Sequence, residues 1–482
     1  MINEIIKKLV TYGIEKNITN KLDKIFVTNK IIEILNLKEY SEPETEYKDI
    51  TLKETLEELY DYAIQSGIIK DDEQEKNELS SQVMGCLLPL PHEVTDSFKK
   101  IFRTSPKRAT SWLYSLAKDS DYIKTYEISK NVKWSPSTKY GRVDILIDSQ
   151  KKEQTNPKTN SYPKCGMCHE NEGYKSNSNL RMLPITVDKE DWMFWYASEG
   201  HFNEQCIASN PKHSAVPIND STFTKLFEFI NIFPHYFVGI EPEIGFGNQP
   251  APEHEKFMGG YCETPIEKAS VEKYYSVKRF EDVQLGILKW PATAIRIRYK
   301  DYTKLVKLAN HIYQKWKIYN DEALNIVDKT NGEEHNSACF IARKIGDLYE
   351  LDIILRNNRK TSLYPQGIFN PSEKYHHIKS DGLTLSDFMG MAVLPARLNP
   401  ELKAVADKIL ECENLYEDEL TAKHAKWVEK FILEYDDISG DNIDKIIQTE
   451  VGRTFIEMLE SSAVFKHNPE GQEGLEKFIQ SL

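Results

Sequence analysis

The spacing of apolar residues changes twice along the chain. Up to about residue 130 they recur at helical intervals: Ile5, Ile6, Leu9 and Val10 form one stripe, and residues 56–69 form a second amphipathic stretch. This pattern predicts a helical N-terminal region, residues 1–125. Within that region, the charged and weakly apolar residues 71–78 indicate a loop.

The middle of the chain mixes alternating and helical patterns. Residues 143–148 and 294–299 alternate as half-buried strands do, whereas residues 221–232 and 302–316 have helical periodicity. Ser221 or Thr222 is the expected cap of the first of these helices. We infer an α+β fold with two consecutive blocks, residues 126–288 and residues 289–398.

Helical periodicity returns after residue 398, so residues 399–482 are predicted to be a helical C-terminal region. Residues 150–162 are polar and indicate an exposed loop between the expected strands. A chain of 482 residues is too long for one ordinary hydrophobic core, which fits this division into several units.

Composition narrows the range of partners and compartments. The net charge of −13 disfavours a nucleic acid or an anionic membrane as partner. No run of about 18 apolar residues occurs, and the first residues lack a signal-peptide core. The seven cysteines are scattered, with one close pair, which is typical of a reduced compartment. We therefore expect a cytoplasmic protein that binds neither nucleic acid nor a membrane.

The close cysteine pair, Cys165-Gly166-Met167-Cys168, is a candidate metal site. Two thiolates at this spacing can bind one Zn²⁺, and the alternative, a redox pair, lacks the surrounding βαβ pattern. Two further ligands are needed. The residues alone do not choose among the neighbouring histidines, which are His169, His201, His213, His235 and His254. Taken by itself, His254 has the surroundings of a solvated loop residue.

A second candidate site lies at a predicted strand end, in Arg356-Asn357-Asn358-Arg359. Guanidinium groups match phosphate oxygens, so Arg356 and Asn357 are candidate substrate-binding residues. A solvated turn at the end of the strand is the alternative interpretation.

Several longer phrases resemble the type 2 galactose-1-phosphate uridylyltransferases. The matches run in order from about residue 84 to residue 398 and include Asn203-Glu204-Gln205-Cys206-Ile207, Phe233-Pro234-His235-Tyr236-Phe237, Gly346-Asp347-Leu348-Tyr349-Glu350-Leu351-Asp352 and Ala392-Val393-Leu394-Pro395. The resemblance implies tandem histidine-triad-like halves with antiparallel sheets and helical extensions at both ends. This agrees with the two α+β blocks.

Enzymes of that family pass UMP from a UDP-hexose to a hexose 1-phosphate through a histidine nucleophile. The nucleophile is the second histidine of a His-x-His-x-Gln-Gly-Gly phrase, which here reads His254-Glu255-Lys256-Phe257-Met258-Gly259-Gly260. Lys256 therefore occupies the nucleophile position and is the candidate catalytic residue, and Met258 replaces the glutamine. Glu253 and Glu255 beside it are expected to keep its amine charged.

The turn before this phrase also departs from the family. Residues 248–253 contain Pro250, Pro252 and Glu253 where the family has small residues that admit phosphate. Prolines remove amide donors, and a carboxylate repels phosphate. The resemblance further implies a zinc site made of Cys165, Cys168, His213 and His254. Zinc with four protein ligands has no open position, so its role would be structural.

Three functions remain open at this stage. One is ordinary uridylyl transfer with a lysine nucleophile, the second is a repurposed nucleotide-sugar or phosphoryl reaction in which Lys256 stabilises charge, and the third is a non-catalytic binding protein. The expected ligand is a nucleotide sugar or a sugar phosphate, and a homodimer is a further expected partnership. In the second half, the resemblance adds His335, Asn336 and Arg343 as candidate substrate-binding residues, with ordinary hydrogen bonding within a strand pair as the alternative.

Overall fold

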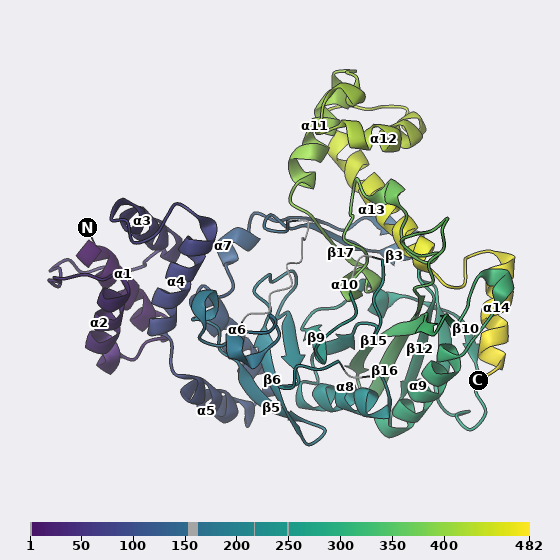
Figure 1. Cartoon of the computed structure of the whole chain (residues 1–482), viewed down its shortest axis with the longest axis horizontal. Coiled ribbons are helices and arrows are strands. Elements are labelled where there is room, and N and C mark those ends of the chain that lie inside the picture. Colours follow the sequence, from purple (N-terminus) through teal and green to yellow (C-terminus); the bar gives the residue numbers. More distant parts are fainter. Residues whose placement is uncertain (1, 153–161, 216, 248–249) are drawn as a thin grey trace. The chain divides into compact units, whose positions relative to one another are not determined.

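The computed structural model describes residues 2–152, 162–215, 217–247 and 250–482, and its contacts divide the chain into two compact units (Figure 1). Unit 1 comprises Met1–Ser129 and Lys158–His213, and unit 2 comprises Lys130–Pro157 and Ser214–Leu482. Most of the loop predicted at residues 150–162 lies outside the described residues, as do Asn248 and Gln249 of the altered turn. The predicted division into four regions stays a prediction.

Unit 1 opens with helices, as the apolar spacing predicts. They are α1 (Ile2–Glu15), α2 (Lys24–Ile34), α3 (Leu52–Gln65), α4 (Glu73–Leu87), α5 (Pro91–Phe102), α6 (Pro106–Asp119) and α7 (Thr125–Ile128). The loop predicted at residues 71–78 is wrong, because α4 already begins at Glu73. The Asp72 side chain accepts hydrogen bonds from the backbone N–H groups of Gln74 and Glu75 and so caps this charged first turn.

The rest of unit 1 is a small antiparallel sheet in the order β5-β6-β7. Its strands are β5 (Leu183–Val187), β6 (Glu190–Tyr196) and β7 (Cys206–Ser209). Tyr196 of β6 is buried, its hydroxyl donates to the Thr110 carbonyl of α6 at 2.6 Å, and its ring meets that of Tyr114 at 4.9 Å. These contacts hold α6 against the sheet.

Unit 2 is built on a larger antiparallel sheet in the order β10-β11-β12-β16-β15-β8-β9. The strands are β8 (Phe237–Ile240), β9 (Lys256–Gly260), β10 (Val271–Tyr275), β11 (Gln284–Leu288), β12 (Ala294–Tyr299), β15 (Asn336–Ile345) and β16 (Leu348–Asn357). A short hairpin of β13 (Lys329–Thr330) and β14 (Glu333–Glu334) precedes β15.

One face of this sheet is apolar and is covered by α8 (Asp220–Ile232) and α9 (Tyr302–Lys317), which lie side by side (Figure 1). Phe340 of β15 contacts Phe223 of α8 and Tyr313 of α9, with ring centroids 4.8 and 5.4 Å apart. The cap predicted for α8 at Ser221 or Thr222 is wrong. Asn219 is the cap, because its side chain accepts from the backbone N–H groups of both residues.

The opposite face of the sheet is polar because side chains alternate along each strand. On β16, Ile353 is the partner of Phe340 and shares the helix-covered face, whereas Glu350, Asp352 and Arg356 lie on the other face. All three are buried. This second face is called the polar face below.

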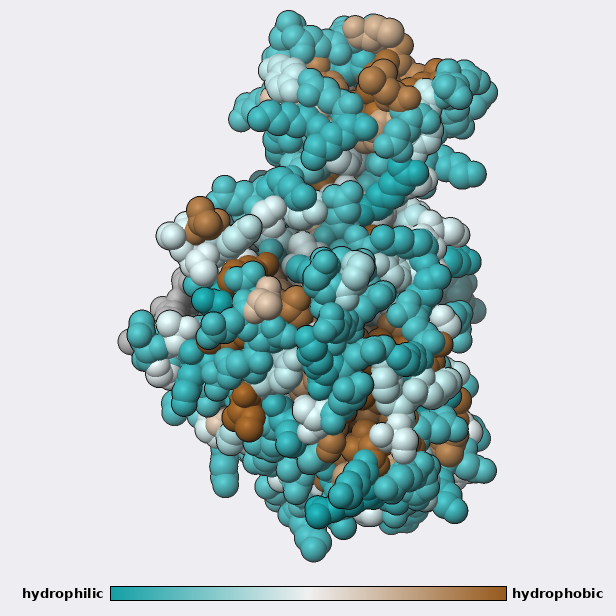
Figure 2. All heavy atoms as spheres, turned by 90° about the vertical axis from the view of Figure 1, so that its right-hand side faces the viewer, coloured by the Kyte–Doolittle hydropathy of each residue, from teal (hydrophilic) through white to brown (hydrophobic). Residues whose placement is uncertain are grey.

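A second, three-stranded sheet has the order β1-β4-β17, from β1 (Val132–Trp134), β4 (Asp144–Ile147) and β17 (Met391–Leu394). The pair of β4 and β17 is parallel, with Ile145 opposite Ala392. The predicted C-terminal helices follow as α11 (Leu398–Leu410), α12 (Ala425–Phe431), α13 (Ile443–Ser462) and α14 (Pro469–Gln480). Figure 2 shows apolar side chains at the surface of the lobe that carries α11 and α12, where Leu410, Leu420 and Leu433 are exposed.

The order of elements repeats along the chain. Each repeat consists of three strands, one helix and two strands. The first repeat is β5, β6, β7, α8, β8 and β9, and the second is β10, β11, β12, α9, β15 and β16. The pairings described above for these strands are all antiparallel. This confirms the predicted α+β class with tandem histidine-triad-like halves. Among the described residues, none of the helices combines the length and the apolar character needed to span a membrane.

Candidate functional site

Lys256, the candidate catalytic residue, is the first residue of β9, at the edge of the polar face. Its ammonium group lies 3.7 Å from a carboxylate oxygen of Glu241, which follows β8, and the Lys256 side chain is 38% exposed. Antiparallel pairing of β8 with β9 brings the two chain segments together, with Gly239 opposite Met258. The result is an accessible ion pair at the position that the sequence resemblance predicts for the nucleophile.

Glu255 and Glu253 were expected to hold Lys256 in its charged form, and the structure corrects the partner. Glu255 points to the helix-covered side, where it forms a buried ion pair with Lys225 of α8 at 3.0 Å, and Glu253 is exposed. Glu241 is the carboxylate paired with Lys256. Residues next to each other along an extended chain point to opposite faces, so the Glu255 side chain points away from Lys256 although the two are adjacent in the sequence.

The cavity beside Lys256 is lined by carboxylates that form ion pairs. Its empty volume is about 450 Å³, part of which is open to solvent, and its lining includes Lys256, His254 and the carboxylates of Glu241, Glu243 and Glu255. Burial alone would raise the pKa of Glu243, but hydrogen bonds from Lys317, the Ile218 amide and Tyr313 bring it below its usual value. Glu243 is therefore an anion at neutral pH, and its charge is balanced by Lys317 at 2.8 Å. The lining carboxylates and their lysine partners neutralise one another, so among the described residues this cavity offers a phosphate no cation without a partner.

Met258 lies two residues beyond Lys256 on the same face, where the family has a glutamine. Its sulfur accepts a long contact of 3.9 Å from the Ser386 hydroxyl of α10 (Leu385–Phe388). Helix α10 packs closely over β8, since a Cβ on Gly239 would lie 2.7 Å from a methyl carbon of Leu385. A thioether donates no hydrogen bond, so Met258 cannot support a phosphate oxygen as an amide does.

Asn336, Asn357 and His335 are held in hydrogen bonds of the fold. Asn336 donates to the carbonyls of Trp316 and Tyr319 at the end of α9, both at 2.8 Å. Asn357 donates to Asn336 and to the Val327 carbonyl. The His335 Nδ1 lies 2.9 Å from the Asn358 side chain. The structure thus brings Asn336 and Asn357 together, but their side chains join α9 to the strand pair.

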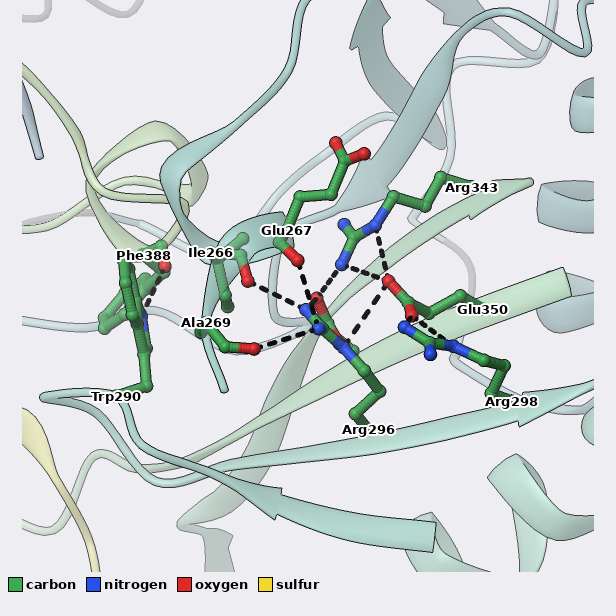
Figure 3. Close-up of polar contacts among 10 residues, drawn as sticks. Ile266, Glu267, Ala269, Trp290, Arg296, Arg298, Arg343, Glu350 and Phe388 are labelled. Atoms are coloured by element: carbon green, nitrogen blue, oxygen red, sulfur yellow. Dashed lines mark hydrogen bonds and ion pairs between the residues drawn. The ribbon is translucent and has the colours of Figure 1, made fainter. Parts of the chain in front are cut away.

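Arg343 belongs to a buried charge network on the polar face (Figure 3). Its Nε donates to Glu350 at 2.7 Å and its Nη2 to Asp352. Arg296 binds Asp352 edge-on through Nε and Nη2, at 2.6 and 2.9 Å, and Arg298 binds Glu350 in the same way. The Arg296 guanidinium also donates to backbone carbonyls of Ile266, Glu267 and Ala269. Three guanidiniums and two carboxylates therefore tie β12, β15 and β16 together.

Arg356, the remaining substrate-binding candidate, differs from these arginines. It is 1% exposed, and no hydrogen bond from its guanidinium to another described residue is present at Nε or Nη2. Its Cζ lies 4.2 Å from the ring centroids of both Phe246 and Phe388. Among the five candidates in the second half, Arg343 and His335 each have one buried nitrogen without a partner in the described part of the chain, Nη1 and Nε2, whereas Arg356 has two adjacent ones, Nε and Nη2, which form an edge that can bind an oxyanion.

Three of the four predicted zinc ligands meet within unit 1. The Sγ atoms of Cys165 and Cys168 are 3.5 Å apart, and each is 3.4 Å from Nδ1 of His213. A tetrahedral zinc ion with ordinary bond lengths places two sulfurs about 3.8 Å apart and a sulfur and a nitrogen about 3.6 Å apart. Two thiols and an imidazole at these separations fit zinc. Asn171 fixes the loop by donating to the carbonyls of both cysteines.

His254, the fourth predicted ligand, belongs to unit 2 and is only 4% exposed. The expectation from its surroundings in sequence, a solvated loop residue, is therefore wrong. It lies just before β9, so a buried imidazole and the accessible Lys256 are two residues apart.

Sequence reasoning missed Glu241, Phe246 and Phe388. The signal for Glu241 was present, because Val238-Gly239-Ile240 reads as a strand and pairing it with the Lys256 strand places the next residue opposite the lysine. No sequence signal identifies Phe246 and Phe388, which come from segments more than 100 residues apart and meet on the two sides of Arg356.

Comparison with known proteins points to the same family as the sequence segments described above. Residues 18–182 match the family model described as "Galactose-1-phosphate uridyl transferase, N-terminal domain". The chain is similar to galactose-1-phosphate uridylyltransferase of Clostridium acetobutylicum, with 38% identity and the whole of both chains covered. It is also similar to galactose-1-phosphate uridylyltransferase 1 of Streptococcus pneumoniae (36% identity, 99% of each chain) and to the Bacillus subtilis protein of that name (32% identity, 99% of this chain and 97% of the relative).

Proposed function

The chain belongs to the galactose-1-phosphate uridylyltransferase family, and from this premise we propose that it acts on a nucleotide sugar or a sugar phosphate with Lys256 as a cation rather than as a nucleophile. In this proposal the phosphoryl or nucleotidyl group passes directly between bound substrates. No covalent nucleotidyl enzyme forms. Fixed cationic charge can stabilise such a transfer without any bond to the protein.

The observation that carries this proposal is the ion pair between Lys256 and Glu241. A lysine in an ion pair is an ammonium, and an ammonium has no lone pair with which to attack phosphorus. The replacement of the family's glutamine by Met258 adds support, because a thioether cannot hold a phosphate oxygen of a covalent intermediate. An approaching phosphate can instead take the place of Glu241 beside the ammonium.

We expect, first, that the protein retains no label after incubation with UDP-glucose labelled in the UMP moiety and separation under conditions that preserve phosphoramidates. In a transfer assay with sugar phosphates as acceptors, Lys256→Met should lower kcat by about 10²- to 10³-fold, the cost of removing one charge-stabilising donor. Lys268→Met is the control, because Lys268 is an exposed lysine paired with Glu263. Label on the wild type that is absent from Lys256→Met would instead establish a lysine nucleophile and ordinary uridylyl transfer.

A non-catalytic nucleotide-sugar or partner-binding role is the second candidate. The ion pairs around the cavity beside Lys256 favour it, since Glu241, Glu243 and Glu255 already occupy Lys256, Lys317 and Lys225. A melting shift with UDP-hexoses, combined with no turnover of any tested acceptor, would select this role over the first.

We also propose that Cys165, Cys168, His213 and His254 hold one structural zinc ion. The resemblance to the family names all four side chains, and three of them meet within unit 1. The spacing of the two thiols and His213 supports the assignment, and the burial of His254 suits a ligand that solvent does not reach. With every coordination position filled by protein, zinc would add rigidity. A homodimer and a cytoplasmic location stay predictions from the sequence.

A further inference from the structure

Arg356 carries a buried charge that forms no ion pair with a carboxylate among the described residues, although the charge of Asp387 acts on it from nearby. Its guanidinium is stacked between the rings of Phe246 and Phe388, each 4.2 Å from Cζ, an arrangement that favours a cation. Burial lowers the pKa of Arg356 to about 10, which still leaves the group charged at neutral pH. Ring stacking satisfies the faces of the guanidinium, but the N–H groups of Nε and Nη2 at one edge have no acceptor among the described residues.

In the other arginines of the polar face, the edge formed by Nε and Nη2 donates hydrogen bonds to carboxylates. Arg296 and Arg298 each turn Nε and Nη2 toward one carboxylate, and Arg343 turns the same two nitrogens toward Glu350 and Asp352. Arg356 lies on the same face of β16, yet its Nε and Nη2 are buried with no hydrogen-bond partner among the described residues. A buried ion without a partner is costly, so this edge is built to receive an acceptor from outside the fold.

A cavity beside Arg356 provides the space. Its empty volume is about 340 Å³, part of which is open to solvent, and Arg356 lines it together with Phe246, Phe388, Thr384 and Glu241 and with aliphatic side chains, among them Ile244, Leu383 and Leu385. The neighbouring acids have cationic partners: Glu241 pairs with Lys256, and Oδ2 of Asp387 accepts from Lys379 at 2.9 Å and from Thr384. Oδ1 of Asp387 is buried with no hydrogen-bond partner among the described residues, and it accepts no hydrogen bond from Arg356 there. Neither Glu241 nor Asp387 forms an ion pair with Arg356 within the described parts of the chain.

We propose that Arg356 binds one oxyanion of a small ligand edge-on in this cavity, through parallel hydrogen bonds from Nε and Nη2. Phosphate and carboxylate share the required geometry. The identification of the ligand as a sugar phosphate rests on the proposed function, since that function supplies a phosphate monoester. Glu241 lines both this cavity and the one beside Lys256, so an anion held by Arg356 lies one side chain away from the Lys256 ion pair.

The test is calorimetric titration of the full-length protein with inorganic phosphate, galactose 1-phosphate, acetate and galactose. We expect phosphate and galactose 1-phosphate to compete for one site, and Arg356→Met to weaken both about tenfold to a hundredfold, the effect of losing charge-assisted hydrogen bonds. Arg359→Gln is the matched control, because Arg359 lies three residues away and donates to the Asn325 carbonyl outside the cavity. It should bind as the wild type does.

A second measurement separates loss of binding from loss of folding. Methionine fills similar space without charge, so Arg356→Met should melt, in the absence of added anions, at a temperature no lower than the wild type. A markedly lower melting temperature would overturn the inference, since it would mean that the fold itself supplies the counter-ion.

The binding outcomes also separate the two proposals. Failure of both phosphate and galactose 1-phosphate to bind the wild type would overturn the anion site whatever the labelling experiment gives. Binding of acetate in preference to either phosphate compound, lost in Arg356→Met, would keep the oxyanion site and remove the sugar phosphate as its ligand.

Discussion

Replacing Asp352 with asparagine is expected to lower the free energy of unfolding by about 3–5 kcal/mol, the usual cost of breaking a buried ion pair from one side. Asp352 is fully buried and accepts from Arg296 and Arg343, so the change leaves two guanidiniums facing an amide that also presents N–H groups. The loss should appear as an earlier urea midpoint, followed by the fluorescence of the buried Trp290 and Trp316.

Asp282→Asn is the matched control for this prediction. Asp282 also accepts from a cation and a hydroxyl, those of Lys304 and Tyr299, but it does so at the surface. Solvent screens such pairs, so its substitution should leave the urea midpoint almost unchanged. Equal shifts for the two variants would contradict a special role of the buried network.

The pH dependence of stability gives an independent check on Asp352. Burial alone would raise the pKa of its carboxyl, but Arg343 and Arg296 more than offset this effect and hold the pKa below its usual value. The contribution is therefore fully present above the unfolded-state pKa of about 3.9 and is lost as the pH falls through the lower folded-state value. The Asp352→Asn variant should lack this component of acid unfolding.

The second large effect is expected from removing the zinc ligands. The double variant Cys165→Ser with Cys168→Ser should contain no zinc, whereas the wild type should contain one zinc ion per chain by elemental mass spectrometry. Structural zinc contributes about 10–16 kcal/mol of apparent binding free energy in small zinc domains. Coupling of even a few kcal/mol of this to folding would lower Tm by about 10 °C, at roughly 2–4 °C per kcal/mol.

Two controls make the zinc prediction specific. Cys412→Ser removes an exposed cysteine and should change neither zinc content nor Tm. His254→Ala should weaken zinc binding while His201→Ala should not, which decides between two histidines that the sequence alone leaves equivalent. A wild-type protein that is free of zinc after expression with added zinc would exclude the site.

The parts of the fold that sequence predicts are those set by local periodicity. Strand β12 spans the six residues whose alternation predicts it, and α9 extends only one residue past the predicted end. The prediction of a loop at residues 71–78 was wrong because the Asp72 side chain caps a helix there. The first turn of this helix is charged and therefore lacks the apolar spacing that indicates a helix.

The residues of the candidate site could be predicted where their type alone indicates their chemistry. They could not be predicted where their partners depend on how the strands pair. The spacing of the two cysteines indicates a metal site, and the structure brings their sulfurs within 3.5 Å of each other and of His213, the histidine that the resemblance implies. An arginine, in contrast, gives no sign in sequence of whether a carboxylate will meet it. Arg343 and Arg356 look alike along the chain, but only the pairing of β12, β15 and β16 decides that the first is neutralised and the second is not.

The parallel pair of β4 and β17 can form only late in the synthesis of the chain, because the two strands are far apart in the sequence. Ile145 and its partner Ala392 are 247 residues apart, as their numbers show, so at about 5–20 residues per second the ribosome needs roughly 12–50 s to deliver the second strand after the first. During that interval one hydrogen-bonding edge of β4 has no native neighbour. We therefore expect β4 to remain available to chaperones, or to unwanted strand partners, until late in the emergence of each nascent chain.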